Sequence, residues 1–159
     1  MEIPTDIAEA IGELLSLESG QDGRKIPVDG WQALQPGIGA LFPGWYRELM
    51  AQYPLAGREF DVDEEGFYQG EIHFWEPAFS EHLADAGELS SFYGAGLSFP
   101  ESGFPFCHLP DGEMIVATGE NPETAVVVYF NGIRLEERSP LNGGLAEFFS
   151  RLIPSDFDG

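Results

Sequence analysis

Among the residues able to perform chemistry, Cys107 and His108 stand side by side as the only pairing of a thiol with an imidazole. A cysteine nucleophile needs its base within hydrogen-bonding reach. Neighbouring residues of a strand point to opposite faces of the sheet, so a strand carrying both would keep the two groups apart. We therefore predict that Cys107 is a small core residue and not a catalytic thiol.

Four residues match the first half of a calcium-binding loop. Asp61, Asp63, Glu65 and Gly66 occupy positions 1, 3, 5 and 6 of that pattern, but position 12, which should be a bidentate glutamate, is Ile72. We expect a solvated turn of mutually repelling carboxylates, with weak cation binding as the alternative.

The remaining candidate ligands also lack a recognisable pattern. His73 and His82 flank Glu76 and Glu81 without the spacing of a zinc site. No glycine-rich phosphate loop with its lysine is present, nor the glycine-serine-glycine elbow of a hydrolase. Carboxylates are so numerous that a glycosidase-like pair stays open, but no pair stands out. We predict no catalytic residue, no metal site and no cofactor, and hence not an enzyme.

These side chains would be positioned by three consecutive antiparallel strands. Ala125–Phe130 is an apolar run rich in β-branched residues, predicted to be a buried strand at the middle of a sheet. Met114–Ala117 precedes it across a polar loop, and Phe104–His108 precedes that across an Asp-Gly turn. Helices flank this scaffold.

A first helix is predicted from Asp6, as N-cap, to near Gly20. A second begins with Pro43 in its first turn and ends before Pro54, and a third is centred on Leu145–Leu152 and stopped by Pro154, leaving a frayed tail. A further section begins with Phe60–Asp63 and is expected to form two strands joined by a turn at Asp63–Gly66, the second strand containing Tyr68, Ile72 and Phe74. The other expected elements are a helix at Pro77–Ala86, strands at Gly96–Phe99 and Ile133–Glu137, and a broken helical turn at Trp31–Gly39.

The pattern predicts an α+β fold: a mainly antiparallel sheet of five or six strands, with N-terminal helices and a C-terminal helix packed on it. The 159 residues suit a single domain, 1–159, ordered from about residue 6 to 153. One cysteine excludes an internal disulfide, and no apolar run reaches the roughly 20 residues of a membrane span. We expect a cytoplasmic protein.

The net charge is the most unusual property, at −21 from 28 acidic and 7 basic residues. No lysine or arginine occurs between Arg58 and Arg134, whereas Glu59 to Glu123 contains 15 carboxylates. Such a field repels nucleic acids and anionic membranes and attracts basic proteins. We therefore expect a basic protein partner, with enhanced solubility alone as the plainer explanation.

Several short segments, taken in order, resemble the SUKH superfamily. They are LFPGWYREL at 41–49, FPF at 104–106, DGE at 111–113, VVVYF at 126–130 and LAEFFSRL at 145–152. The resemblance spans about residues 6 to 153 and rests on the order and spacing of the segments.

The resemblance implies a non-enzymatic protein-binding module. Many bacterial members of the superfamily are immunity proteins that neutralise secreted toxins by direct binding, and many such toxins are nucleases. A basic nuclease cleft would suit an acidic inhibitor. We expect acidic residues to steer the partner and exposed aromatic residues to anchor it. The predicted partner-binding residues are Asp61, Asp63, Glu64, Glu65, Phe67, Tyr68 and Trp75.

Two alternatives stay open at the level of sequence. The first is a regulatory or scaffold module of the same fold with a partner that is not a toxin. The second is an enzyme or cation-binding protein built on carboxylates, which would need them gathered in a concave site with shifted pKa values. The contact face, the oligomeric state and the identity of the partner are not determined by the sequence.

Overall fold

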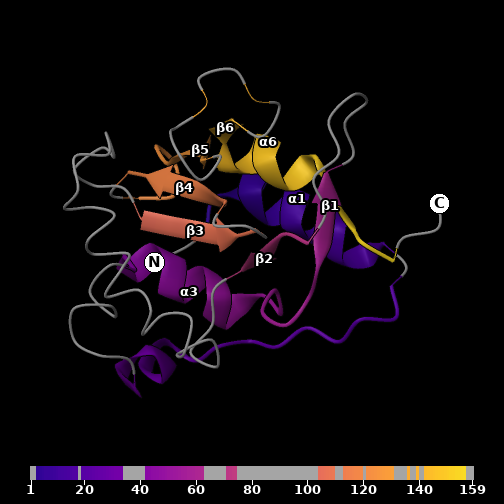
Figure 1. Ribbon diagram of the computed structural model, residues 1–159. Coiled ribbons are helices and arrows are strands. Elements are labelled where there is room, and N and C mark those ends of the chain that lie inside the picture. The colour runs from indigo at the N-terminus through magenta and orange to yellow at the C-terminus, as the bar shows by residue number, and fades with distance from the viewer. Residues whose placement is uncertain are drawn as a thin grey trace.

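The structure is a computed structural model, described here for residues 3–17, 19–33, 42–62, 71–74, 104–109, 113–119, 121–130, 136, 139 and 142–156. These residues form two antiparallel sheets with helices packed on them (Figure 1). The described helices are α1 (Thr5–Ser16), α3 (Gly44–Gln52) and α6 (Leu145–Ser150), with a 3-10 helix η1 (Val28–Ala33). The α+β class with a mainly antiparallel sheet is confirmed.

The larger sheet has five strands in the order β2-β3-β4-β5-β6. Their bounds are β2 (His73–Phe74), β3 (Phe104–His108), β4 (Met114–Thr118), β5 (Val126–Phe130) and β6 (Gly143–Gly144). The three consecutive strands predicted from the sequence are therefore present as β3, β4 and β5.

The centre of this sheet is β4 and not β5, which corrects the prediction that Ala125–Phe130 lies in the middle. Met114 to Ala117 are all buried, whereas Val126 of β5 is 44% exposed. An apolar run identifies a strand, but its neighbours decide which strand is central. The short β6 covers only one end of β5, pairing with Val126 and Val127.

The register of β3 against β4 shifts between Pro105 and Cys107. Such a bulge sets two residues of one strand against a single residue of its partner. Phe106 and Cys107 are consecutive, yet both are fully buried. The bulge accounts for this departure from strict alternation, and it leaves His108 half-buried after them.

The smaller sheet pairs β1 (Phe60–Val62) with β7 (Leu152–Pro154). It corrects the predicted C-terminal helix, because α6 ends at Ser150 and the next residues form a strand. Pro154 lies in this strand opposite Phe60. At the start of the tail that was predicted to be frayed, the Ser155 N–H donates to the Glu59 carbonyl at 3.0 Å.

Aromatic side chains from α3, β3 and α6 form the centre of the core. Tyr46 of α3 has its ring 5.4 Å from that of Phe106, and its hydroxyl donates to the Phe106 carbonyl at 3.1 Å. Phe148 of α6 contacts the same ring from its own helix, at 5.6 Å. Figure 1 shows α3 running beside β3, and α1 beside α6.

The boundaries of two helices, α1 and α3, differ from the prediction. The N-cap of α1 is Pro4, so that Asp6 lies in the first turn, and α1 ends at Ser16, before Gly20. Pro43 is the N-cap of α3 and not its first helical residue. The expected elements Asp63–Gly66, Pro77–Ala86, Gly96–Phe99 and Ile133–Glu137 lie wholly or mainly outside the described residues.

Candidate functional site

Of the predicted partner-binding residues, the structure describes only Asp61, on β1. Its main chain lies opposite Ile153 of β7, and its side chain is half-buried. The other predicted positions, Asp63, Glu64, Glu65, Phe67, Tyr68 and Trp75, lie outside the described residues.

The structure places Asp61 beside Glu71, a residue not predicted as part of a site. The main-chain N–H of Glu71 donates a hydrogen bond to the Asp61 carboxylate. Burial, together with the nearby Glu71 charge, raises the pKa of Asp61 above its ordinary value, and that hydrogen bond only partly opposes the shift. Asp61 and Glu71 therefore form a like-charged pair, hereafter the Asp61–Glu71 pair.

The backbone at Glu71 is strained. Its φ is 63°, and no other non-glycine residue in the described part of the chain has a positive φ. A side chain in this left-handed region costs energy and is held there by its surroundings. The next residue, Ile72, is fully buried and exchanges two 3.0 Å main-chain hydrogen bonds with Phe60. This bridge fixes Glu71 against β1.

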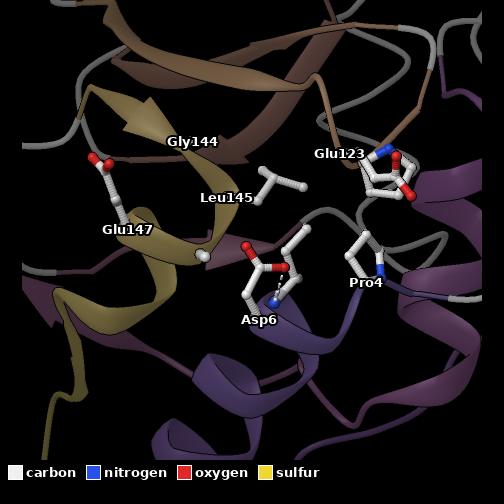
Figure 2. Close-up of a pocket in the computed structure, with 9 residues that line it drawn as sticks. Pro4, Asp6, Glu123, Gly144, Leu145 and Glu147 are labelled. Carbon is white, nitrogen blue, oxygen red and sulfur yellow. Dashed lines mark hydrogen bonds between the residues drawn. The ribbon is translucent and has the colours of Figure 1, made fainter.

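A second acidic feature is a hollow between α1, the loop joining β4 to β5, and α6. Its volume is about 300 Å³. Figure 2 shows Asp6 and Glu123 on either side of the hollow near Leu145, whereas the Glu147 side chain points away from them. The hollow is lined by Pro4, Asp6, Ile7, Pro122, Glu123, Gly144, Leu145, Ala146 and Glu147.

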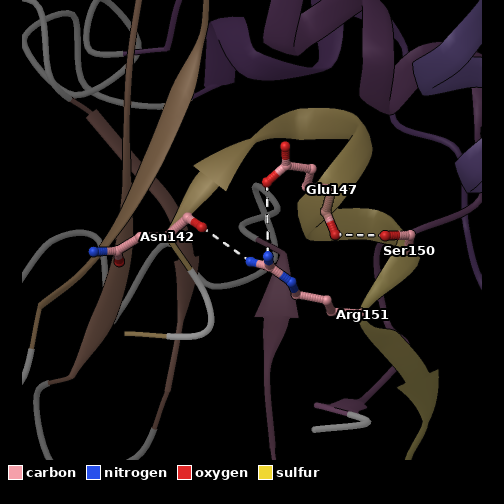
Figure 3. A network of polar contacts seen from close by, with 4 residues as sticks. All are labelled: Asn142, Glu147, Ser150 and Arg151. Atoms are coloured by element: carbon pink, nitrogen blue, oxygen red, sulfur yellow. Dashed lines mark hydrogen bonds and ion pairs between the residues drawn. The ribbon is translucent and has the colours of Figure 1, made fainter. Parts of the chain in front are cut away.

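Two of the three acids in the hollow already have structural partners. The Asp6 carboxylate accepts a hydrogen bond from the Ile7 N–H at 2.9 Å, within the first turn of α1. Glu147 faces Arg151 one helical turn later, with 3.6 Å between Oε2 and Nη2 (Figure 3). Such exposed pairs contribute little stability, but they do offset charge locally.

Arg151 also ties α6 to the preceding segment. Its Nη1 donates to the Asn142 carbonyl at 2.9 Å (Figure 3). The Asn142 side chain in turn accepts from the Tyr129 N–H at 2.9 Å and donates to the Glu136 carbonyl at 2.7 Å. The Asn142 side chain therefore gives Tyr129 of β5 a hydrogen-bond partner beyond the residues of β5 that pair with β6. This contact indicates a structural role for Asn142.

A third acidic feature is Asp156, which joins the segment after β7 to the segment after α1. It accepts hydrogen bonds from the Ser19 hydroxyl and the Gly20 N–H, each at 2.7 Å. These bonds hold the pKa of Asp156 below its ordinary value. Its charge also acts on Arg58, the one buried charged residue among those described, whose pKa is lowered by burial.

Cys107 is fully buried, and burial raises the pKa of its thiol well above the usual range. A thiol that stays protonated in the core is a poor nucleophile, as predicted from the sequence. His108 instead lies against His73 of the neighbouring strand, with ring centroids 5.1 Å apart.

The described residues contain no group of three or more histidine, cysteine or carboxylate side chains able to hold a metal ion. None of the described helices has the length and apolar character required to cross a bilayer. The described acids are distributed over α1, η1, α3, β1, α6 and the loops, and none of them is buried.

Comparisons with protein-family models, with curated proteins and with solved structures found no match to this chain.

Proposed function

We propose that this protein is a non-enzymatic binding module that neutralises a basic toxin, such as a nuclease, by direct contact through its acidic surface. The Asp61–Glu71 pair carries the proposal. A cation brought next to two carboxylates relieves their mutual repulsion, so it gains more there than beside an isolated, fully hydrated acid. The SUKH resemblance supports the same class of function.

The physical state of Asp61 fits contact with a cationic side chain. Its ionised form is disfavoured by partial burial and by Glu71. An arginine of the partner would replace lost water with charge-assisted hydrogen bonds and lower the pKa of Asp61 again. Binding would then release protons where Asp61 is partly protonated, and affinity would weaken as the pH falls through its pKa.

The net charge of −21 supports the part of the proposal that concerns the rate of association with the partner. A large negative field speeds encounter with a basic protein and is screened by salt. A nuclease exposes basic groups to hold phosphate, and carboxylates arranged on an inhibitor would compete for those groups. The mechanism is blockage of the toxin surface without chemical change to the toxin.

The test is co-expression with the toxin-like product of the adjacent gene. Survival of the cells and co-purification of a salt-sensitive complex are the expected results. Cells that die, with no complex even at low salt, would overturn the proposal. A complex with a host protein but no protection would point to the regulatory or scaffold alternative.

Two substitutions then test the pair itself. Asp61→Asn and Glu71→Gln should each weaken binding about tenfold, because each removes one charge from the contact. Glu13→Gln, on an exposed position of α1, removes the same charge elsewhere and is the matched control. Equal weakening by all three variants would show that only the net charge matters and that the pair has no special role.

A further inference from the structure

Three consecutive residues bind both oxygens of the Asp156 carboxylate. Its Oδ1 accepts from the Ser19 hydroxyl at 2.7 Å and from Nε2 of Gln21 at 3.2 Å, and its Oδ2 accepts from the Gly20 N–H at 2.7 Å. An ionised carboxylate is an acceptor only, and its hydrogen bonds are stronger than those between neutral groups. The three donors therefore match the recognition pattern of a carboxylate.

The same donors are positioned by contacts that do not involve Asp156. The Gln21 N–H donates to the Ser19 hydroxyl oxygen at 3.0 Å, which leaves the hydroxyl proton for the carboxylate. The Gln21 side chain is fixed by two hydrogen bonds with the main chain of Glu59. Donors that are already in place lose little conformational freedom when they bind a ligand.

A buried cation lies beside these donors. Arg58 is only 6% exposed, and its Cδ lies 2.8 Å from the position that a Cβ at Gly23 would occupy. Its Nε N–H is buried and has no hydrogen-bond partner in the structure, and its charge interacts with that of Asp156. Burying a cation without full hydrogen bonding is costly, so Arg58 favours an anion close to it.

The surroundings of Arg58 are more basic than the chain as a whole. Arg24 and Lys25 are exposed, and Arg24 exchanges main-chain hydrogen bonds of 2.8 and 3.3 Å with Ala56, two residues before Arg58. These three are among only seven basic residues in a chain of net charge −21. The local charge therefore suits an anion, in contrast to the net charge.

We propose that this region is a carboxylate-binding site, filled by the chain's own Asp156 and able to accept an aspartate or glutamate side chain of another protein in its place. Asp156 is exposed, so a carboxylate from solution can compete with it. The binding residues are Ser19, Gly20, Gln21 and Arg58. Because the ligand is an anion, the site is distinct from the contact with a basic toxin and does not depend on it.

The test is rescue of an Asp156→Ala variant of the full chain by sodium acetate. This variant empties the site and should have a lower thermal midpoint than the parent in sodium chloride at neutral pH. Replacing chloride with acetate, at about 0.5 M, should raise the midpoint of the variant by about 2–4 °C more than that of the parent, because acetate binds the folded variant. In ¹⁵N NMR spectra, acetate should shift the Gly20 amide signal of the variant to a plateau and leave that of the parent unchanged.

Glu9→Ala, at an exposed position of α1, removes a carboxylate elsewhere and is the matched control. It should respond to acetate as the parent does. Adding Ser19→Ala to Asp156→Ala removes one donor and should weaken acetate binding about tenfold or more. An equal response of the parent and Asp156→Ala, or a Gly20 amide that does not move, would overturn the proposal. Tighter binding of phosphate than of acetate would also overturn it. No toxin is present in these measurements, so their outcome is separate from the test of the proposed function.

Discussion

The side-chain amide of Gln21 pairs with both main-chain polar groups of Glu59. The Glu59 N–H donates to Oε1 at 2.5 Å, and Nε2 donates to the Glu59 carbonyl at 3.2 Å. The Gln21 side chain thus pairs with the main chain just before β1 in the way that a peptide group of a neighbouring strand would. Its Nε2 also lies 2.9 Å from the Ser155 hydroxyl, so one side chain links the segment after α1 to the C-terminus.

Replacing Gln21 with alanine should destabilise the protein by about 1–3 kcal/mol, because it removes the side-chain partner of two half-buried main-chain groups. Urea unfolding measures the change. Gln52→Ala, at an exposed position at the end of α3, is the control and should change the stability by less than about 0.5 kcal/mol. Equal effects of the two substitutions would mean that the Glu59 contacts contribute nothing specific.

Asn142 has the corresponding role at the edge of β5. Asn142→Ala removes the acceptor of the Tyr129 N–H and should cost about 1–3 kcal/mol. Asn142→Asp keeps that acceptor but places a carboxylate against the Glu136 carbonyl, so it should also destabilise the protein. Hydrogen exchange at the Tyr129 amide should accelerate more in the alanine variant than in the aspartate variant. The reverse order would contradict the assigned contacts.

Replacing Asp61 with asparagine should have opposite effects on the stability of the protein and on its binding of the partner. Its raised pKa means that folding disfavours the ionised form, so the protein gains stability as the pH falls through that pKa. At neutral pH, Asp61→Asn should therefore raise the free energy of unfolding, by less than about 1 kcal/mol because solvent screens the half-exposed carboxylate. The same variant should bind the partner less tightly. A variant that loses both stability and binding would indicate a structural role only.

The contribution of Asp156 to stability should have a pH dependence opposite to that of Asp61. Hydrogen bonds to its carboxylate lower its pKa, so its contribution is present above the ordinary carboxyl pKa of about 3.9 and is lost as the pH falls through the lower, folded value. Asp156→Asn should have a lower free energy of unfolding than the parent at pH 6, and this difference, the stability gap, should disappear at low pH. Glu9→Gln controls for the loss of one negative charge. A gap independent of pH would show that the charge of Asp156 is not involved.

The sequence predicted the three central strands correctly because each has a length and composition that suits only a strand. It also predicted Cys107 as a core residue, and burial of the thiol confirms this. The alternation rule did not anticipate that Phe106 and Cys107 are both buried, since a bulge depends on how β3 registers against β4. Likewise, Leu152 continues the helical pattern of α6 but begins the strand β7, because β1 offers main-chain partners there.

The chain's composition and local patterns determined its α+β class, its acidic character and the types of most described elements, since these follow from propensity, periodicity and charge. Only the tertiary structure decided that β4 is central, that Glu71 takes a left-handed backbone beside Asp61, and that His73 meets His108. Each of these depends on residues far apart in the chain, or on a backbone conformation fixed by its neighbours. Local sequence does not encode such pairings, because many registers satisfy the same alternation of apolar and polar side chains.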